Sequence, residues 1–328
     1  MNTPVYSNLE EKSHHFNHKI INSKEELDEL LETWSMKDDS KRYIFRGVNN
    51  AKFKLYNSGQ RAWTGQELEK LGKSYQEFIQ QEIDYAKAFQ SNLLVKFFNA
   101  FGHNAYDFSI LSFLQHYGSP TPLLDFSYNF ECGLFFCMDG MSHYASEDID
   151  NYFSIYAIDT NQSDLISILN HLESNTKNIE ELLSKHGNID VDDSEVLNNL
   201  ENLNYSRLEE LRLFYLPGYQ DRGTRFTIPS RPGFQLVYNQ HNLNIINQEG
   251  LFVFNSDSEH PLEDYFNDGK FTSFNRTFSL KKIHCWDIHK SFGEYILNRL
   301  SYKGITRDFI YPQEEFIALS AFKNFKGL

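Results

Sequence analysis

The stretch from Leu111 to Cys137 most constrains what this chain can fold into, because it sets turn-forming and polar residues between two apolar runs. The residues up to Leu114 have the pattern of one apolar helix face. Pro120 and Pro122 each lack a backbone donor and push the preceding residue toward extended geometry. We therefore expect a helix that stops at Gly118 and is followed by a turn.

Several polar side chains cluster around this turn. The core is expected to resume at Leu123 and Leu124 and again at residues 133–138. The polar residues are thus held on a stiff loop between two buried elements, as a preorganised site requires. They are His116, Tyr117, Thr121 and Asp125, followed by Ser127 and Asn129 at alternating positions. The alternative is that His116 and Asp125 only hydrogen-bond backbone groups in the turn, because one His and one Asp form no specific constellation.

Arg46 is a second candidate for ligand contact. Residues 43–45 are good strand formers, and Gly47 can end or bulge a strand. This pattern predicts Arg46 at a strand terminus, next to a glycine that lets another backbone or a ligand come close. Such an arginine suits a bidentate grip on phosphate or carboxylate. Pairing with a core carboxylate such as Asp125 is an equal alternative.

The composition indicates a globular protein with a full core. The chain has 328 residues and is 40% hydrophobic, which is enough for one large domain or two ordinary ones. Its net charge of -14 argues against a surface that coats nucleic acid, although a local basic patch is compatible with it. Cys132, Cys137 and Cys285 have apolar neighbours and no metal-ligand spacing. They predict buried free thiols of a reducing compartment, for which we expect the cytoplasm.

The N-terminal residues carry acidic side chains and no apolar core region, which is not the pattern of a signal peptide. No run reaches the roughly 18 uncharged apolar residues that a membrane span needs, so we expect no membrane association. His14, His15 and His18 have no acidic or cysteine partner at ligand spacing. We therefore expect residues 1–22 to form a flexible, solvated segment, and we expect no metal site.

Periodicity predicts further elements along the chain. Ser23 is expected to cap a helix whose Leu27, Leu30, Leu31 and Trp34 face inward. We also expect a long helical region at 65–101, strands at 152–159, 251–254 and 283–288, an amphipathic helix at 293–304, and a polar, helix-prone insertion at 161–210.

Gln248 and Glu249 stand just before a glycine and the strand expected at 251–254. A carboxylate at such a strand edge suits a general base or a ribose ligand, and it equally suits an ordinary turn. The chain has no Walker loop, no Rossmann glycine fingerprint, no nucleophile elbow and no paired CxxC. These absences remove the commonest enzyme classes.

Several blocks, in order along the chain, resemble the FRG domain family, which is named for its Phe-Arg-Gly signature. The blocks are Phe45-Arg46-Gly47, Arg61, Gln115-His116-Tyr117-Gly118, Pro120-Thr121, Leu123-Leu124-Asp125, Asn129, Leu134-Phe135-Phe136, Gln248, Gly250-Leu251-Phe252 and residues 304–312. The chain departs from the family at Pro122, Phe126 and Cys137, where an Arg, a Trp and a small Ala are usual. The resemblance implies an FRG domain over residues 23–328 that contains the insertion at 161–210.

The order of these blocks also resembles ADP-ribosyltransferase-like proteins. This resemblance implies a single-domain α+β fold in which a split, mixed or antiparallel sheet flanked by helices clamps NAD, the substrate, in an extended conformation. Arginine would grip the pyrophosphate, the central block would position ribose and nicotinamide, and one late residue would take the third-motif role. The implied catalytic residues are Glu249, Gln248 and His116, and the implied NAD-binding residues are Arg46, Gly47, Tyr117, Thr121, Asp125, Ser127 and Asn129.

The implied reaction is loss of nicotinamide through an oxocarbenium-like transition state, with transfer of ADP-ribose to a protein or nucleic-acid acceptor. At the family level we expect a toxin or a phage-defence effector that a regulatory or inhibitory protein partner restrains. A second hypothesis is a non-enzymatic module that senses a nucleotide or an anionic partner, and it predicts that ligand binding survives the loss of Glu249. A third is a metal-dependent nuclease using His116 and Asp125, although the chain has no clustered carboxylate ligands.

Overall fold

The computed structural model describes residues 3–35, 43–100, 105, 107–141, 148–160, 213–216, 225–227, 235–237, 243–266, 270–273, 276–279 and 282–313. The insertion expected at 161–210 lies outside the described residues. None of the described helices is long and apolar enough to cross a membrane.

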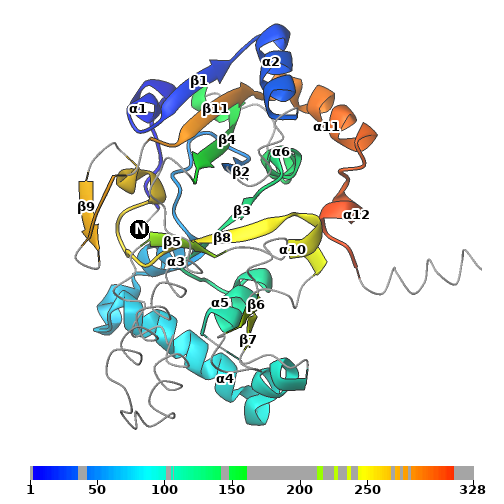
Figure 1. The fold of residues 1–328 in the computed structure, drawn as a ribbon. Helices are drawn as coiled ribbons and strands as arrows, with labels where there is room; N and C mark the ends of the chain where they lie inside the picture. Colours follow the sequence, from blue (N-terminus) through cyan, green and yellow to red (C-terminus); the bar gives the residue numbers. More distant parts are fainter. Residues whose placement is uncertain are drawn as a thin grey trace, which may run out of the picture.

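One seven-stranded sheet forms the centre of the fold (Figure 1). Its strands, in spatial order, are β1 (Asn17–Ile21), β11 (His284–His289), β4 (Tyr152–Asp159), β2 (Tyr43–Val48), β3 (Leu123–Ser127), β8 (Gly250–Asn255) and β5 (Leu213–Leu216). Neighbouring strands pair antiparallel, except β1 and β11, which are parallel. The expected α+β class with a mixed sheet is thereby confirmed. Two small antiparallel ribbons pair β6 (Arg225–Thr227) with β7 (Gln235–Val237) and β9 (Lys270–Ser273) with β10 (Arg276–Ser279).

The sheet opens between β2 and β3. These two strands share a single registered pair, Phe45 with Ser127. On either side the pairing is long, since β2 pairs with β4 from Tyr43 to Val48 and β3 pairs with β8 along its whole length. Continued antiparallel register would bring Gly47 opposite Asp125, but the strands have already separated there. The middle of the sheet therefore has a gap into which side chains and ligands can enter.

Helices α2 (Lys24–Ser35), α6 (Phe130–Met138) and α11 (Gly293–Tyr302) pack on one face of β2 and β4. Trp34 of α2 lies against Phe45 and Phe130, with ring centroids 5.1 and 6.1 Å away. The four inward residues predicted for α2 are all buried, because their spacing follows the helical period. Short elements complete this region: α1 (Leu9–Ser13), η2 (Asp148–Asn151), η5 (Lys290–Phe292) and α12 (Arg307–Ile310).

A second group of helices lies at the opposite end of the molecule from α2 and α11 (Figure 1). It comprises α3 (Ser58–Gly65), η1 (Leu68–Leu71), α4 (Tyr75–Ala100) and α5 (Asp107–His116), and α10 (Leu243–Asn247) and η4 (Leu262–Tyr265) flank β8. The long helical region expected at 65–101 is present as η1 and α4, with two interruptions. Gly72, in the left-handed region with φ +71°, caps η1 and ends it, and the α4 backbone is non-helical at residues 89–92.

The central stretch folds as its sequence predicts. Helix α5 ends at His116, and Gly118 takes the left-handed conformation, with φ +82°, that the turn demands. The chain then enters β3, and Asn129 caps α6 by accepting a hydrogen bond from the backbone of Cys132. The three cysteines, Cys132, Cys137 and Cys285, are free and buried, as predicted.

The expectation of a solvated N-terminal segment is wrong for residues 5–21. Strand β1 joins the sheet edge, and Tyr6, Phe16 and Ile21 are buried in the core. The side chain of Lys12 is fully buried, and that of His18 is 7% exposed. The segment is buried because its apolar side chains pack against residues far away in the sequence, and because the charge partner of Lys12 also lies far away.

Candidate ligand-binding cleft

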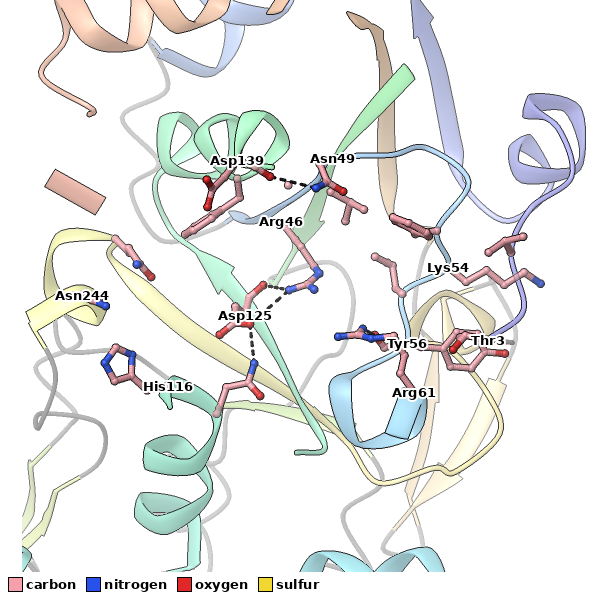
Figure 2. A pocket seen from close by; sticks show the side chains of 18 of the residues that line it. Thr3, Arg46, Asn49, Lys54, Tyr56, Arg61, His116, Asp125, Asp139 and Asn244 are labelled. Atoms are coloured by element: carbon pink, nitrogen blue, oxygen red, sulfur yellow. Dashed lines mark hydrogen bonds and ion pairs between the residues drawn. The ribbon is translucent and has the colours of Figure 1, made fainter. Parts of the chain in front are cut away.

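A cleft of about 810 Å³ lies where β2 and β3 separate (Figure 2). Its walls are formed by residues from the N-terminal segment, β2, the chain before α3, the end of α5, β3 and the α10–β8 turn. The lining includes Arg46, Gly47, Lys54, Tyr56, Arg61, Gln115, His116, Asp125, Asp139, Gln248 and Tyr311. The volume falls within the range of small-molecule sites, which is roughly 300–1,000 Å³.

The Phe-Arg-Gly block gives β2 two different faces. Phe45 is 5% exposed and packs under α6, and a Cβ added to Gly47 would lie 2.0 Å from the carbonyl oxygen of Gly133 in that helix. Arg46, the residue between them, points to the other side, because side chains alternate along a strand. The expectation that Arg46 lies at a strand terminus is therefore wrong, and Gly47 does not end the strand. The glycine lets α6 approach β2 closely.

Arg46 bridges the gap between the strands. Its Nη1 donates a hydrogen bond to the backbone carbonyl of Asp125 at 2.6 Å, and the same atom is 3.9 Å from the Asp125 carboxylate. Its buried Nε has no partner among the described residues. A buried donor without a partner costs about 1–3 kcal/mol, and a ligand that draws the guanidinium into a two-point contact would offset this cost.

Arg61 brings a second positive charge to the cleft. Figure 2 shows Arg46 from β2 and Arg61 from α3 reaching into the same hollow. Burial lowers the pKa of the Arg46 guanidinium, the charge of Asp125 raises it, and the like charge of Arg61 lowers it. Both side chains stay protonated, because an arginine pKa lies far above neutrality. Two guanidiniums that line one cleft favour the binding of an anion there.

A chain of hydrogen bonds holds the Asp125 carboxylate in place. Gln115 Nε2 donates to Asp125 Oδ2 at 2.7 Å. Gln115 Oε1 accepts hydrogen bonds from the hydroxyl groups of Thr121 and Ser58, which fixes the orientation of the amide. Asp125 Oδ1 has no hydrogen bond among the described residues, and the side chain is 53% exposed. One carboxylate oxygen is thus anchored and the other is available to a ligand.

The second carboxylate of the cleft, Asp139, is fully engaged. Its Oδ1 accepts a hydrogen bond from Arg307 Nη1 at 2.6 Å, and its Oδ2 accepts one from the hydroxyl of Tyr311 at 2.8 Å. These contacts attach the α12 region to the end of α6. Asp139 therefore has a structural role, and Asp125 is the carboxylate with an oxygen to offer.

The structure brings together five of the ten site residues expected from the sequence. Arg46, Gly47, His116, Asp125 and Gln248 line the cleft. The other five do not line it: Tyr117 is 68% exposed, Thr121 and Ser127 are buried, and Asn129 and Glu249 contact each other. Ser127 donates to the backbone carbonyl of Gln248 at 2.6 Å, and this bond joins β3 to the turn before β8.

Glu249 lies outside the cleft wall. Its Oε1 accepts a hydrogen bond from Asn129 Nδ2 at 3.0 Å, and its backbone carbonyl accepts one from Tyr128. Its φ of +47° places it in the left-handed region, which is rare for a residue other than glycine. Gln248 does reach the cleft, and its Nε2 donates to the carbonyl of Ile310.

Sequence reasoning did not assign Gln115 or Arg61 to the site, although both fall in the blocks that resemble the FRG family. Gln115 could have been found as the residue beside His116 on the last turn of the expected helix. Tyr56 and Tyr311 add aromatic surface to the cleft and were not assigned to the site either, although Tyr311 falls in the block at 304–312. They are placed by contacts between segments far apart in the chain.

A buried polar cluster lies on β1 and β11, and none of its residues lines the cleft. His18, Cys285 and Asp287 place three potential metal-ligating atoms within 4.8 Å of one another. The ammonium of Lys12, however, lies 2.6 Å from Asp287 Oδ1 and donates to Ser154. Lys12 is thus the cation of this cluster, and Asp287 Oδ2 contacts His18 Nε2 at 2.7 Å. The cluster joins the N-terminal segment to the sheet.

Comparison with known proteins identifies one region of the chain. No curated protein and no solved structure matches it. The resemblance to ADP-ribosyltransferase-like proteins therefore has no counterpart among these comparisons. The FRG domain model matches residues 41–146, which contain β2, α3, α5, β3 and α6 and hence most of the cleft wall. Through this match, residues 41–146 of the chain are similar to the FRG domain family.

Proposed function

We propose that the cleft binds a nucleotide through its phosphates, and that this nucleotide is NAD, consumed in an ADP-ribosyltransferase-like reaction. The observation that carries the proposal is the pair of guanidiniums, Arg46 and Arg61, at the opening of the sheet. Arginine forks match the geometry of phosphate oxygens, and a diphosphate would relieve the repulsion between the two charges.

The remaining lining supports a nucleotide rather than inorganic phosphate. The cleft is far larger than one phosphate group. Tyr56, Phe136 and Tyr311 offer ring surfaces on which a base can stack. Neutral hydrogen-bonding groups come from Gln248 and Asn244. Polar groups that converge beside apolar and aromatic surface are typical of a cofactor site.

The proposed chemistry breaks the bond between C1′ of the ribose and the nicotinamide nitrogen. The electron pair leaves with nicotinamide, and positive charge develops on the ribose. A carboxylate beside that ribose stabilises the transition state, after which an acceptor nucleophile attacks C1′ and loses its proton. We assign the carboxylate role to Asp125, because Glu249 is not among the residues that line the cleft.

A second candidate function is nucleotide sensing without turnover. The position of Glu249 favours it, since the late carboxylate expected from the sequence is hydrogen-bonded to Asn129. A sensing module requires the arginine pair but no carboxylate beside the ribose.

Calorimetry with NAD and ADP, together with nicotinamide release from labelled NAD and label transfer to cell extract, tests the proposal. Arg46→Gln and Arg61→Gln should each weaken binding about tenfold to a hundredfold, the value of one or two charge-assisted hydrogen bonds. Arg299→Gln, on α11, is the matched control and should bind as the wild type does. Thermal melts establish that each variant is folded.

The outcomes separate the two candidates. Turnover by the wild type that is lost in Asp125→Asn supports the transferase. Binding without nicotinamide release supports the sensing module and contradicts the enzyme. A folded wild-type protein that binds neither NAD nor ADP refutes both.

A further inference from the structure

The Asp125 carboxylate can recognise the sugar of a ligand through hydrogen bonds. Its Oδ2 accepts a hydrogen bond from Gln115. The Gln115 amide cannot flip without losing the hydrogen bonds that it accepts from the hydroxyl groups of Thr121 and Ser58. Asp125 Oδ1 has no hydrogen bond among the described residues, and half of the side chain is exposed. The carboxylate therefore presents a fixed acceptor that a ligand donor can satisfy.

The position of this acceptor beside Arg46 limits which ligand group can meet it. Asp125 Oδ2 is 3.9 Å from Arg46 Nη1. When a phosphate of the ligand binds Arg46, the ligand group bonded to that phosphate therefore lies next to the Asp125 carboxylate. In a nucleoside 5′-phosphate that neighbour is the sugar, and the base lies one ring further on. A second phosphate at this position would be repelled by the carboxylate.

Resting on the proposed nucleotide function, we infer that the cleft selects ribonucleotides over deoxyribonucleotides. Asp125 would accept hydrogen bonds from the 2′- and 3′-hydroxyl groups of the ribose next to the arginine-bound phosphate, which is the nicotinamide ribose in NAD and the adenosine ribose in ADP. A vicinal diol supplies two neutral donors to one carboxylate, and such charge-assisted bonds are stronger than neutral ones. A sugar without these hydroxyl groups leaves Oδ1 desolvated and unpaired. Gln115 acts as a positioning residue, because it holds the carboxylate toward the ligand.

The selectivity follows from a site built to pair hydroxyl donors. Such sites reject analogues that lack the hydroxyl group strongly, because the protein group is then left without a partner. We expect ADP to bind about tenfold to a hundredfold more tightly than 2′,3′-dideoxy-ADP, which corresponds to one or two charge-assisted bonds. Inorganic pyrophosphate, which has no sugar, should be disfavoured by the carboxylate.

Calorimetry with ADP, 2′,3′-dideoxy-ADP and pyrophosphate on the full chain tests this inference. Asp125→Ala should lose the preference for ADP and bind pyrophosphate more tightly than the wild type does. These opposite changes distinguish a direct contact from general damage to the cleft. Gln115→Met should reduce the preference for ADP while leaving pyrophosphate affinity almost unchanged. Asp84→Ala is the control, because Asp84 is exposed on α4 and does not line the cleft, and it should keep the wild-type preference.

Three results would overturn the inference. Equal affinity of the wild type for ADP and dideoxy-ADP would show that the sugar is not read, while leaving the phosphate site intact. A preference for ADP that persists in Asp125→Ala would place the sugar contact elsewhere. A wild type that binds neither nucleotide would remove the proposed function and this inference together.

Discussion

Replacing Gly47 by alanine puts a methyl group where α6 packs on β2. The new Cβ would lie 2.0 Å from the carbonyl oxygen of Gly133 and 2.7 Å from the backbone nitrogen of Cys137. Both are backbone atoms, so no change of rotamer relieves the clash. The short contact must open to about 3.4 Å, the lower limit of ordinary contact, and this moves the helix away from the strand.

The cost follows from the packing that this movement disturbs. Phe45 and Phe130 meet across the same interface with ring centroids 5.3 Å apart, and a gap of about 0.5–1 Å already forfeits a quarter to a half of a dispersion contact. Overpacked cores lose about 1–3 kcal/mol. Because the obstacle is backbone, we expect Gly47→Ala to lower the free energy of unfolding by about 3 kcal/mol, at the upper end of that range.

Urea unfolding followed by tryptophan fluorescence measures the effect, since Trp34 lies against Phe45 and Phe130. Gly133→Ala is the matched control. Its Cβ would meet side-chain atoms of Phe45 and Ile155 at 3.1 and 3.2 Å, and alanine gains about 1 kcal/mol of helix propensity over glycine. The control should stay within about 1 kcal/mol of the wild type. A Gly47→Ala protein as stable as the wild type, or equal losses in both variants, would refute the reasoning.

Two further predictions concern buried charges. Burial raises the pKa of Glu263 to about 7 from 4.5, so the folded state holds a proton between these values that the unfolded state has released. The stability that this group contributes therefore falls as pH rises through that window. Glu263→Gln should flatten the slope of the unfolding free energy against pH, between pH 5 and 7.5, by up to about 1.4 kcal/mol per pH unit. An unchanged slope in urea titrations would contradict this prediction. Asp287→Asn leaves the fully buried Lys12 without its carboxylate and should cost about 3–5 kcal/mol in urea unfolding. Glu29→Gln, which removes the exposed pair with Lys19, is its control and should change little, so similar losses in both would count against a special role for the buried pair.

The elements that the sequence predicted well depend on local pattern. The inward face of α2 follows from helical periodicity, and the stop at Gly118 follows from a residue type that tolerates a positive φ. Strand β4 has the limits expected for it, because six of its eight buried residues are apolar or aromatic. These features need no information about distant residues.

The errors arise where distant residues decide. The N-terminal segment carries two lysines and three histidines, which indicate solvent exposure in isolation. Lys12 is buried because Asp287, 275 positions later, neutralises it. Gly47 suggested the end of a strand, yet its lack of a side chain serves a helix that begins more than 80 residues further on. Neither partner could be inferred from the neighbouring sequence.

The candidate site shows the same division. The sequence by itself determined which residue types are present, namely a strand arginine beside a glycine and an aspartate after a proline-rich turn, because backbone propensity and hydrophobic period act locally. Only the tertiary structure decided that Arg46 bonds the Asp125 carbonyl, that Gln115 holds the carboxylate, and that Glu249 meets Asn129. The physical reason is that the separation of β2 from β3 creates the cleft, and the spacing of two strands depends on everything packed around them.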